Sequence, residues 1–216
     1  MIRLVLADDE PMIRVGVRTI LTSDPGIEVV AEAADGREAV EAVRRHRPAI
    51  VLLDIRMPRF DGLAAAQELA VIAPEVKVVM LTTFDEDEYV ARALAVGASG
   101  FLLKAADPKE LILGVRSVAD GAAFLSPRIA QKVITRLGDG LARGDTARTR
   151  IARLTARERD VLVLVGRGLS NQEIARTLKL AEGTVKAHVS AILLRLDLNN
   201  RVQAAILAYE AGLVTG

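Results

Sequence analysis

The chain lacks cysteine, so its 216 residues contain no disulfide framework, thiolate metal site or cysteine nucleophile. It also lacks any apolar run approaching the roughly 18 residues that a membrane-spanning helix requires. The first residues show none of the charged region, apolar stretch and small-residue cleavage site of a signal peptide. These absences favour a soluble, cytoplasmic protein without a membrane partner, and the length is sufficient for two domains that each bury a core.

The net charge of +1 conceals an asymmetry between the two halves of the chain. Residues 1–120 hold 14 Lys and Arg residues against 20 Asp and Glu residues, a net charge of −6. Residues 121–216 hold 15 Lys and Arg residues against 8 Asp and Glu residues, a net charge of +7. The asymmetry favours a cation site in the first half and a polyanion partner for the second, although unevenly distributed surface charge gives the same totals.

Short β-branched runs alternate with longer segments of helical period over the first 120 residues. Several runs are apolar throughout, which is typical of parallel strands that are buried on both faces. The pattern predicts five βα units in a doubly wound α/β domain with a parallel five-stranded sheet. The runs are Ile2 to Ala7, Ile27 to Ala33, Ala49 to Leu53, Val76 to Leu81 and Gly100 to Leu103, and the helical segments lie near 11–22, 36–46, 62–72, 86–96 and 108–119.

Carboxylate, hydroxyl and amine side chains stand at the ends of these expected strands. In a doubly wound sheet the functional crevice lies at the carboxyl ends of the strands, where the strand order reverses. Neighbouring carboxylates repel one another unless a hard divalent cation neutralises them, and Mg²⁺ is the natural occupant. The residues concerned are Asp8, Asp9, Asp54, Thr82 and Lys104.

This constellation predicts a phosphoryl-transfer pocket. A carboxylate can act as a nucleophile and form an acyl phosphate when a cation and a Lys neutralise the charge on the phosphoryl oxygens. Asp54 is the expected nucleophile because it stands alone at the end of the central run. The Thr82 hydroxyl is expected to donate to a phosphoryl oxygen, and Phe101 is expected to change position when Thr82 moves.

Each of these residues also has a structural interpretation. An Asp that follows a strand is often only a helix N-cap, and a Thr there is often only a β former. A lone Lys104 at the end of a buried strand is harder to explain by structure alone, and the joint occurrence at several strand ends favours function. A Mg²⁺-dependent phosphohydrolase is the enzyme alternative, but such enzymes often carry a second acid two residues after the nucleophile, where this chain has Arg56.

The first half resembles the receiver domain of two-component response regulators, over roughly residues 1–119. The resemblance implies a phosphoacceptor rather than an enzyme with a separate substrate. It rests on the motifs Leu6 to Glu10, Asp54 to Pro58 with Asp61 and Gly62, Val79 to Thr82, and Gly100 to Lys104.

The resemblance also assigns roles within the pocket. It implies that Asp54 accepts a phosphoryl group from a phosphohistidine of a partner sensor histidine kinase. Asp8, Asp9 and Asp54 are implied to bind Mg²⁺, with the backbone carbonyl of Arg56 as a further ligand. The remaining roles are a conformational relay for Thr82 and Phe101 and an ion pair with the phosphoryl group for Lys104.

From about residue 120 the pattern changes and no strand signal returns. Residues 138–150 are rich in Gly, basic and poor in large apolar side chains, which indicates a mobile linker. The stretch from Pro127 to Leu137 has helical spacing and suits a short linker helix. We therefore expect a first domain over 1–119, a linker over 120–150 and a second domain over 151–216.

The second domain is expected to contain four short helices. Thr155 to Glu158 and Ser170 to Glu173 both have capping-box spacing and open the first two helices. The third is expected from Glu182 to Leu196 and the fourth from Asn200 to Ala211. Helices joined by such a short turn predict a helix-turn-helix, whose second helix enters the DNA major groove.

The expected recognition helix has a buried stripe and an outward face. Short side chains on the outward face allow close approach to the groove, and the two cations are placed to meet phosphates or base edges. A solvated helix face with two ordinary cations is an equally good interpretation of this helix taken alone. The outward residues are Thr184, Lys186, Ala187, Ser190 and Arg195, and the buried stripe is Val185, Val189, Ile192 and Leu196.

The segment from Leu154 to Val214 resembles the LuxR-type DNA-binding domain. Together with the receiver motifs, it makes the whole chain resemble the NarL/FixJ family of response regulators. In that family the third helix reads the groove and the last helix pairs two copies of the chain. The matching stretches are 154–159, 161–162, 168–175, 182–189, 192–193 and 196, followed by 201 and 203–204.

One departure from the family pattern concerns the start of the recognition helix. Ala181 stands where Ser or Thr is common, so the helix lacks a side-chain N-cap, a deficit of about 0.5–2 kcal/mol. We expect this start to fray in the free protein and to become ordered on DNA. Ser190, at a position that varies among relatives, is expected to influence which promoter is bound.

The mechanism that follows is phosphorylation of Asp54, movement of Thr82 and Phe101, and a changed surface near the fourth and fifth βα units. That change is expected to release the DNA-binding domain or to favour a homodimer on promoter DNA. The main alternative is a transcription factor that is DNA-competent without phosphate and uses its receiver for another signal.

Overall fold

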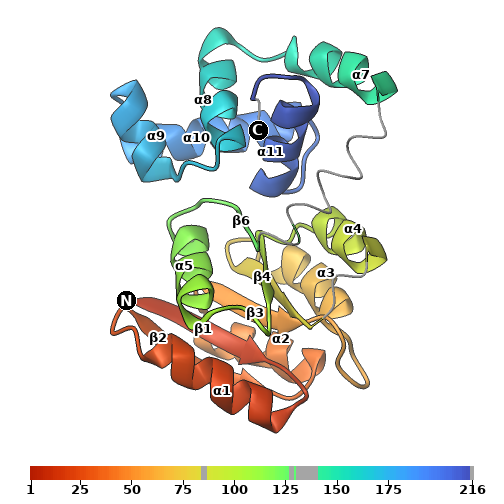
Figure 1. The fold of residues 1–216 in the computed structure, drawn as a ribbon, viewed down its shortest axis with the longest axis vertical. Coiled ribbons are helices and arrows are strands. Elements are labelled where there is room, and N and C mark those ends of the chain that lie inside the picture. The colour runs from red at the N-terminus through yellow and green to blue at the C-terminus, as the bar shows by residue number, and fades with distance from the viewer. Residues whose placement is uncertain (84–86, 127–128, 130–140, 215–216) are drawn as a thin grey trace. The chain divides into compact units, whose positions relative to one another are not determined.

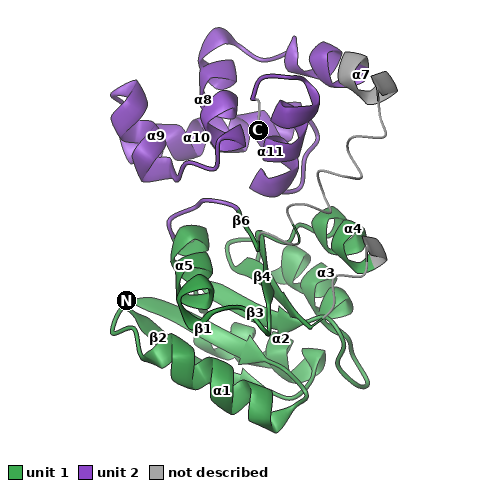
Figure 2. Ribbon diagram, in the orientation of Figure 1, with its two compact units in different colours: residues 1–119, 124–129 green, residues 120–123, 130–216 purple. Residues whose placement is uncertain are grey.

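The computed structural model describes residues 1–83, 87–126, 129 and 141–214, which form two compact units (Figures 1 and 2). Unit 1 comprises residues 1–119 and 124–129, and unit 2 comprises residues 120–123 and 130–216. No helix in the described ranges combines the length and the apolar character needed to cross a membrane.

Unit 1 is built on a parallel sheet with the strand order β2-β1-β3-β4-β5-β6. The order reverses between β1 and β3, so the ends of these two strands open into the crevice expected of a doubly wound fold. The strands are β1 (Ile2–Ala7), β2 (Ile27–Ala33), β3 (Ile50–Asp54), β4 (Lys77–Thr82), β5 (Gly100–Leu103) and β6 (Phe124–Leu125).

The prediction of five parallel strands is confirmed, but the sheet has a sixth. The expectation that no strand follows residue 120 is wrong, because β6 pairs with β5 through the partners Gly100–Phe124 and Phe101–Leu125. The Ser126 amide also donates to the Phe101 carbonyl at 3.0 Å. A two-residue strand has no periodicity of its own and exists because this tertiary contact holds it.

Helices cover both faces of the sheet, which explains why β3 is buried at every residue. α1 and α5 pack on one face, where Leu6, Leu52 and Leu102 share a core with Leu21 and Val115. α2, α3 and α4 lie on the other face (Figure 1). The helices are α1 (Pro11–Thr22), α2 (Gly36–His46), α3 (Gly62–Ile72), α4 (Asp87–Ala95) and α5 (Pro108–Ala119).

Unit 2 is helical, and its local signals agree with the sequence. Both predicted capping boxes are present, at Thr155–Glu158 and at Ser170–Glu173. Ala181 makes no side-chain cap at the start of α10, as expected. The helices are α7 (Leu141–Ile151), α8 (Ala156–Gly166), α9 (Asn171–Leu178), α10 (Glu182–Arg195) and α11 (Arg201–Glu210).

Helix α7 corrects the linker prediction. Residues 138–150 were expected to form a mobile linker, yet residues 141–151 are helical. Ala147 and Ile151 are buried in the core of unit 2, and Arg150 donates to the Leu196 carbonyl. Two apolar side chains are sufficient to anchor this helix, because the surrounding helices supply the remaining apolar surface of the core. The short helix predicted over 127–137 lies outside the described residues, apart from position 129.

Candidate functional site

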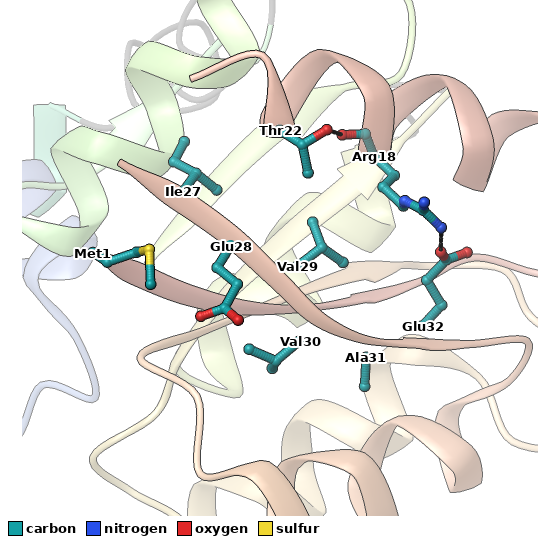
Figure 3. A pocket seen from close by; sticks show the side chains of 9 residues that line it. All are labelled: Met1, Arg18, Thr22, Ile27, Glu28, Val29, Val30, Ala31 and Glu32. Carbon is teal, nitrogen blue, oxygen red and sulfur yellow. Dashed lines mark hydrogen bonds and ion pairs between the residues drawn. The ribbon is translucent and has the colours of Figure 1, made fainter. Parts of the chain in front are cut away.

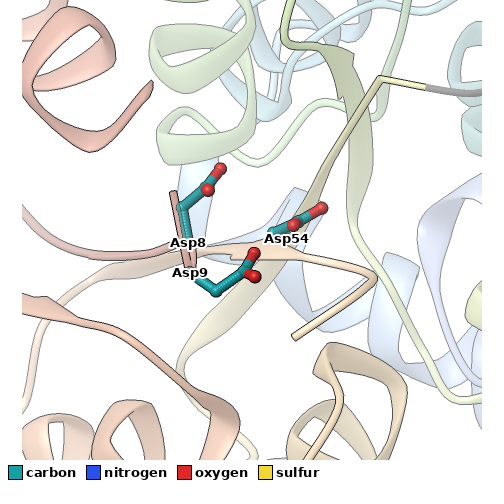
Figure 4. A group of neighbouring side chains, drawn as sticks. All are labelled: Asp8, Asp9 and Asp54. Atoms are coloured by element: carbon teal, nitrogen blue, oxygen red, sulfur yellow. The ribbon is translucent and has the colours of Figure 1, made fainter. Parts of the chain in front are cut away.

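Three carboxylates meet at the ends of β1 and β3, as Figure 4 shows. Asp8 and Asp9 follow β1 directly, and Asp54 is the last residue of β3. Asp8 is fully buried and Asp54 is 5% exposed, whereas Asp9 is exposed. One oxygen from each of the three lies within 4.8 Å of the others. The parallel pairing of β1 with β3 explains this convergence of residues that lie 45 or 46 positions apart.

Lys104 lies among these carboxylates. It follows β5, and its Nζ lies 2.8 Å from Asp8 Oδ2 and 3.0 Å from Asp54 Oδ2. A third carboxylate, that of Glu10, approaches Lys104 Nζ to 3.4 Å from the solvent side. The Lys104 side chain is only 4% exposed. Its charge is therefore held by buried partners and is weakly screened by water.

The protonation of the pocket reflects this burial. Burial raises the pKa of Asp54, the nearby Asp8 acts in the same direction, and the hydrogen bond to Lys104 opposes both. Burial alone would lower the pKa of Lys104, but its contacts with the carboxylates of Asp8 and Asp54 outweigh burial and raise the pKa. Lys104 is therefore cationic at neutral pH and supplies a fixed positive charge beside Asp54.

The two predicted relay residues occupy neighbouring strands. Thr82 ends β4 and is 5% exposed, and its carbonyl accepts a hydrogen bond from the Lys104 amide at 2.8 Å. Phe101 is fully buried on β5, opposite Met80 of β4 and Leu125 of β6. Because side chains alternate along a strand, Phe101 faces away from the core that Leu102 shares with α1 and α5.

The loop after β3 carries Arg56, the residue whose carbonyl was expected to bind the metal. Its backbone amide hydrogen-bonds to Asp54. Its guanidinium lies 5.4 Å from the centre of the Tyr89 ring on α4. The Arg56 side chain thus spans the loop and α4, and its backbone adjoins the candidate phosphoacceptor.

Gly62 is a site residue that the sequence pattern alone does not explain. A Cβ atom at this position would lie 1.9 Å from the Asp54 carbonyl oxygen. Its amide donates to the Ile55 carbonyl at 3.0 Å, which closes the loop at its base. The Asp61-Gly62 pair is visible in the sequence, but the need for glycine follows from a close approach that only the fold creates.

The donor set fits a hard divalent cation. Carboxylate oxygens are the ligands that Mg²⁺ prefers, and Asp8, Asp9 and Asp54 supply three of them. The buried Asp8 Oδ2 has Lys104 as its ion-pair partner but accepts no hydrogen bond of regular geometry. In the part of the chain that the structure describes, this is the one group of three or more potential metal-ligating side chains.

A second depression lies beside the edge strand β2 and is shown in Figure 3. It is lined by residues of β2, by Arg18 and Thr22 of α1, and by Met1. Arg18 is paired with Glu32 at 2.9 Å, so the main charges there already neutralise each other. This depression lacks the convergent carboxylates and the buried cation of the pocket at β1 and β3.

Unit 2 presents the outer face of α10 to solvent. Leu194, which the sequence pattern does not single out, lies on the same helix and is 86% exposed. Val185, Ile192 and Leu196 are buried as expected, and Val189 is half-buried. The residues predicted to contact DNA are all exposed, namely Thr184, Lys186, Ala187, Ser190 and Arg195.

Both predicted DNA-contacting cations have partners within unit 2. Lys186 Nζ lies 2.7 Å from Glu182 Oε1, one helical turn earlier. Arg195 lies 3.2 Å from Glu158, the buried carboxylate of the first capping box. The sequence pattern does not predict the Arg195 contact, since Glu158 lies on another helix and its spacing from Thr155 indicates only a capping role.

Two family matches cover most of the chain. Residues 4–116 match the response regulator receiver domain, and residues 152–208 match the bacterial regulatory proteins of the luxR family. The boundary between the two matches falls in the region where the sequence changes from acidic to basic.

Similar proteins match this chain over nearly its full length. The transcriptional regulatory protein DegU of Brevibacillus brevis is 37% identical over 99% of this chain and 95% of its own length. The response regulator protein VraR of Staphylococcus aureus is 35% identical over 99% of both chains. The crystal structure of the response regulator ChrA has 34% identity and a TM-score of 0.54, and the match covers 99% of this chain and 98% of ChrA. The chain therefore belongs to the NarL/FixJ family of response regulators, which regulate transcription by joining a receiver domain to a LuxR-type DNA-binding domain.

Proposed function

We propose that a sensor histidine kinase phosphorylates Asp54 and that this modification controls dimerisation and promoter binding. The observation that carries the proposal is the position of Lys104, whose Nζ contacts both Asp8 and Asp54 in a buried group of carboxylates. A cation fixed beside a candidate nucleophile is the arrangement that stabilises a transferring phosphoryl group.

The transfer step uses the Asp54 carboxylate as nucleophile. A carboxylate oxygen forms a bond to phosphorus while the P–N bond of the phosphohistidine breaks, and the bonding electron pair leaves with the imidazole nitrogen. Lys104 neutralises charge on the phosphoryl oxygens, and the Thr82 hydroxyl donates to one of them. When bound by Asp8, Asp9 and Asp54, with the Arg56 carbonyl as a further ligand, Mg²⁺ supplies additional positive charge at the phosphoryl oxygens.

The strand pairing supports a route from the pocket to the remainder of unit 1. Lys104 follows β5, the strand that carries Phe101, and β6 pairs with that strand at Phe101. A shift of Lys104 and Thr82 toward a phosphoryl group therefore acts on a strand that is hydrogen-bonded to β6. We infer that this shift changes the surface near β4, α4 and β5 and favours a homodimer.

For DNA binding, we propose that α10 enters the major groove and that two copies meet half-sites about one helical turn apart. Thr184, Ala187 and Ser190 are exposed and short, which permits close approach to base edges. Lys186 and Arg195 contact phosphates by exchanging their intramolecular carboxylate partners for DNA. We assign residues 1–119 to the receiver domain, 120–150 to the linker region, within which α7 begins, and 151–216 to the DNA-binding domain.

The test combines intact mass and gel-shift binding to a library of promoter fragments, with and without Mg²⁺ and a small phosphodonor. Asp54→Asn is compared with the natural chain and with Asp120→Asn, an exposed Asp outside the pocket. The proposal expects one added phosphoryl mass that is lost only in Asp54→Asn, together with phosphate-dependent tightening of DNA binding. DNA binding that is strong and identical in all three proteins, without any mass gain, would instead indicate a phosphate-independent transcription factor.

A further inference from the structure

The loop that follows the candidate phosphoacceptor is fixed at its base. Gly62 closes this loop by packing its Cα against the Asp54 carbonyl and by donating its amide to Ile55. The base is therefore determined by backbone contacts alone. The tip of the loop, at Arg59 and Phe60, needs a separate anchor, because four residues lie between Asp54 and Arg59.

The N-terminus of α2 provides that anchor. Asp35 caps the helix by accepting a hydrogen bond from the Glu38 amide, and its other oxygen accepts from Arg59 Nε at 2.8 Å and from Arg59 Nη2. The Gly36 amide donates to the Phe60 carbonyl at 2.8 Å. The Arg37 guanidinium lies 4.2 Å from the centre of the Phe60 ring. Three consecutive residues at the start of α2 thus contact both residues at the loop tip.

The backbone of Arg59 indicates that the Asp35 contact constrains the loop. Arg59 has φ of +66°, a left-handed conformation that side chains other than glycine rarely adopt. Such conformations persist where the surrounding structure holds them. The Asp35 side chain is only 5% exposed. Hydrogen bonds from the Glu38 amide and then from Arg59 lower the pKa of Asp35, so its carboxylate is ionised at neutral pH.

The same turn also contacts the other half of the acidic pocket. The Ala33 carbonyl, two residues before Asp35, accepts a hydrogen bond from the Asp8 amide at 3.1 Å. Residues 33–37 therefore touch both the segment that carries Asp8 and Asp9 and the loop that begins at Asp54. A brace between these two segments sets the spacing of carboxylates that come from different strands.

We propose that Asp35 and Arg59 are positioning residues that hold the Asp54 loop in register with Asp8 and Asp9, and that they thereby set the affinity of the pocket for Mg²⁺. This inference rests on the proposed function of the pocket. Neither residue contacts the phosphoryl group, and both act through the backbone between Ile55 and Asp61.

The variants separate the ion pair from its other effects. Arg59→Ala removes the pair and keeps a side chain in the left-handed conformation, whereas Arg59→Gly removes the pair and relieves the backbone. Asp35→Asn keeps a good N-cap but removes the charge. The matched control is Arg116→Ala, because Arg116 makes a similar two-nitrogen pair with Asp24 at 2.6 and 2.7 Å, and Asp24 precedes β2, far from its carboxyl end.

The first measurement is amide hydrogen exchange over residues 56–61 in the full chain, without metal and without phosphodonor. We expect Arg59→Ala, Arg59→Gly and Asp35→Asn each to speed exchange there by about tenfold, with Arg116→Ala matching the natural chain. The second measurement is a calorimetric Mg²⁺ titration. We expect the three variants to raise the dissociation constant by about tenfold, which is the lower end of the effect seen when residues that support metal ligands are changed. The double variant Asp35→Asn with Arg59→Ala should bind Mg²⁺ no more weakly than either single variant, because both changes remove the same ion pair.

Three results would overturn the inference. If the variants exchange and bind Mg²⁺ like the natural chain, the positioning role is wrong although phosphorylation of Asp54 stands. If Arg116→Ala has the same effect as Arg59→Ala, the effect reflects general loss of stability and not positioning. A natural chain that neither binds Mg²⁺ nor accepts phosphate would refute the proposed function, and this inference with it.

Discussion

Two lysines of this chain, each paired with carboxylates, show how burial changes the meaning of one interaction. Lys104 is 4% exposed and lies between Asp8 and Asp54, which are themselves buried. Lys186 is 62% exposed and pairs with Glu182, which is 46% exposed. Water and salt screen the second pair much more strongly than the first. Under the proposed function, the receiver pocket depends on a buried charge that is fixed before phosphoryl transfer, whereas DNA binding by α10 depends on an exposed cation that can exchange partners.

The largest expected difference between these lysines is in stability. Lys104→Met leaves two buried carboxylates without their cation, and removing one partner of a buried pair costs about 3–5 kcal/mol. Lys186→Met removes an exposed pair of the i,i+4 kind, which contributes about 0.3–0.5 kcal/mol. Urea unfolding in metal-free buffer, followed by circular dichroism, compares the free energies of unfolding. Equal losses in the two variants would show that burial does not distinguish the pairs.

For DNA binding, we expect the larger effect in Lys186→Met and the smaller effect in Lys104→Met, the opposite of their order in stability. Lys186→Met is expected to reduce the slope of log Kd against log salt concentration by about one unit, because one phosphate contact is lost. Lys104→Met leaves α10 unchanged and should leave that slope unchanged in the unphosphorylated chain. Gel shifts at several salt concentrations provide the measurement.

A pair of glycines extends the comparison from charge to packing. Gly62→Ala places a Cβ 1.9 Å from the Asp54 carbonyl oxygen, so the loop or the strand must shift. We expect a loss of about 1–3 kcal/mol and a pocket that no longer accepts phosphate. Gly183, on α10, has nothing within 4 Å of an added Cβ. Gly183→Ala should therefore stabilise unit 2 by about 0.4–1 kcal/mol.

Thermal unfolding and phosphorylation by a small phosphodonor check this prediction together. Gly16→Ala is the control within unit 1, because Gly16 lies in α1 and an added Cβ there also meets nothing within 4 Å. Stability and phosphorylation that are unchanged in Gly62→Ala would contradict the close approach described for this residue.

The comparison also explains which features the sequence could predict. Asp8, Asp54 and Lys104 were predicted together because strand ends are visible in a pattern of apolar runs, and because parallel strands bring their carboxyl ends to one edge. The capping boxes were predicted because both partners lie within four residues. In each case either periodicity or short spacing carries the information.

Contacts between elements that lie far apart in the sequence were missed for the opposite reason. β6 exists because of its pairing with β5, and α7 because Ala147 and Ile151 find a core that other helices create. Arg59 and Asp35 lie 24 residues apart, and neither their residue types nor their spacing predicts that they form an ion pair. No local signal marks such contacts, so only the fold reveals them.

The Glu158–Arg195 pair is intermediate in burial between the two lysine pairs, since Glu158 is buried and Arg195 is exposed. The Thr155 amide and hydroxyl, together with Arg195, lower the pKa of Glu158 below its usual value near 4.5. Because the folded pKa is the lower one, Glu158 stabilises unit 2 above pH 4.5, and this contribution is lost as the pH falls through the folded pKa.

Glu158→Gln should therefore cost about 1 kcal/mol near neutral pH, and progressively less as the pH falls through the lowered folded pKa of Glu158, below which the natural chain carries a protonated Glu158 too. Chemical unfolding from pH 3 to pH 7 measures the difference between the two proteins. The variant also frees Arg195, so its DNA affinity should rise at low salt. A stability difference that stays constant with pH would show that the charge of Glu158 contributes nothing.

The last comparison concerns Ala181, whose position before α10 offers the amides of the first turn no side-chain acceptor. Ala181→Ser supplies that acceptor and should stabilise the start of the recognition helix by about 1 kcal/mol, which slows amide exchange there by about fivefold. Ala187→Ser, the same substitution within the helix, provides no cap and should not slow exchange in the first turn. We expect DNA to order this turn in either protein, so the serine should also tighten DNA binding by removing part of the ordering cost. If the first turn of the natural chain is already strongly protected without DNA, a missing cap does not fray this helix, and neither gain should be observed.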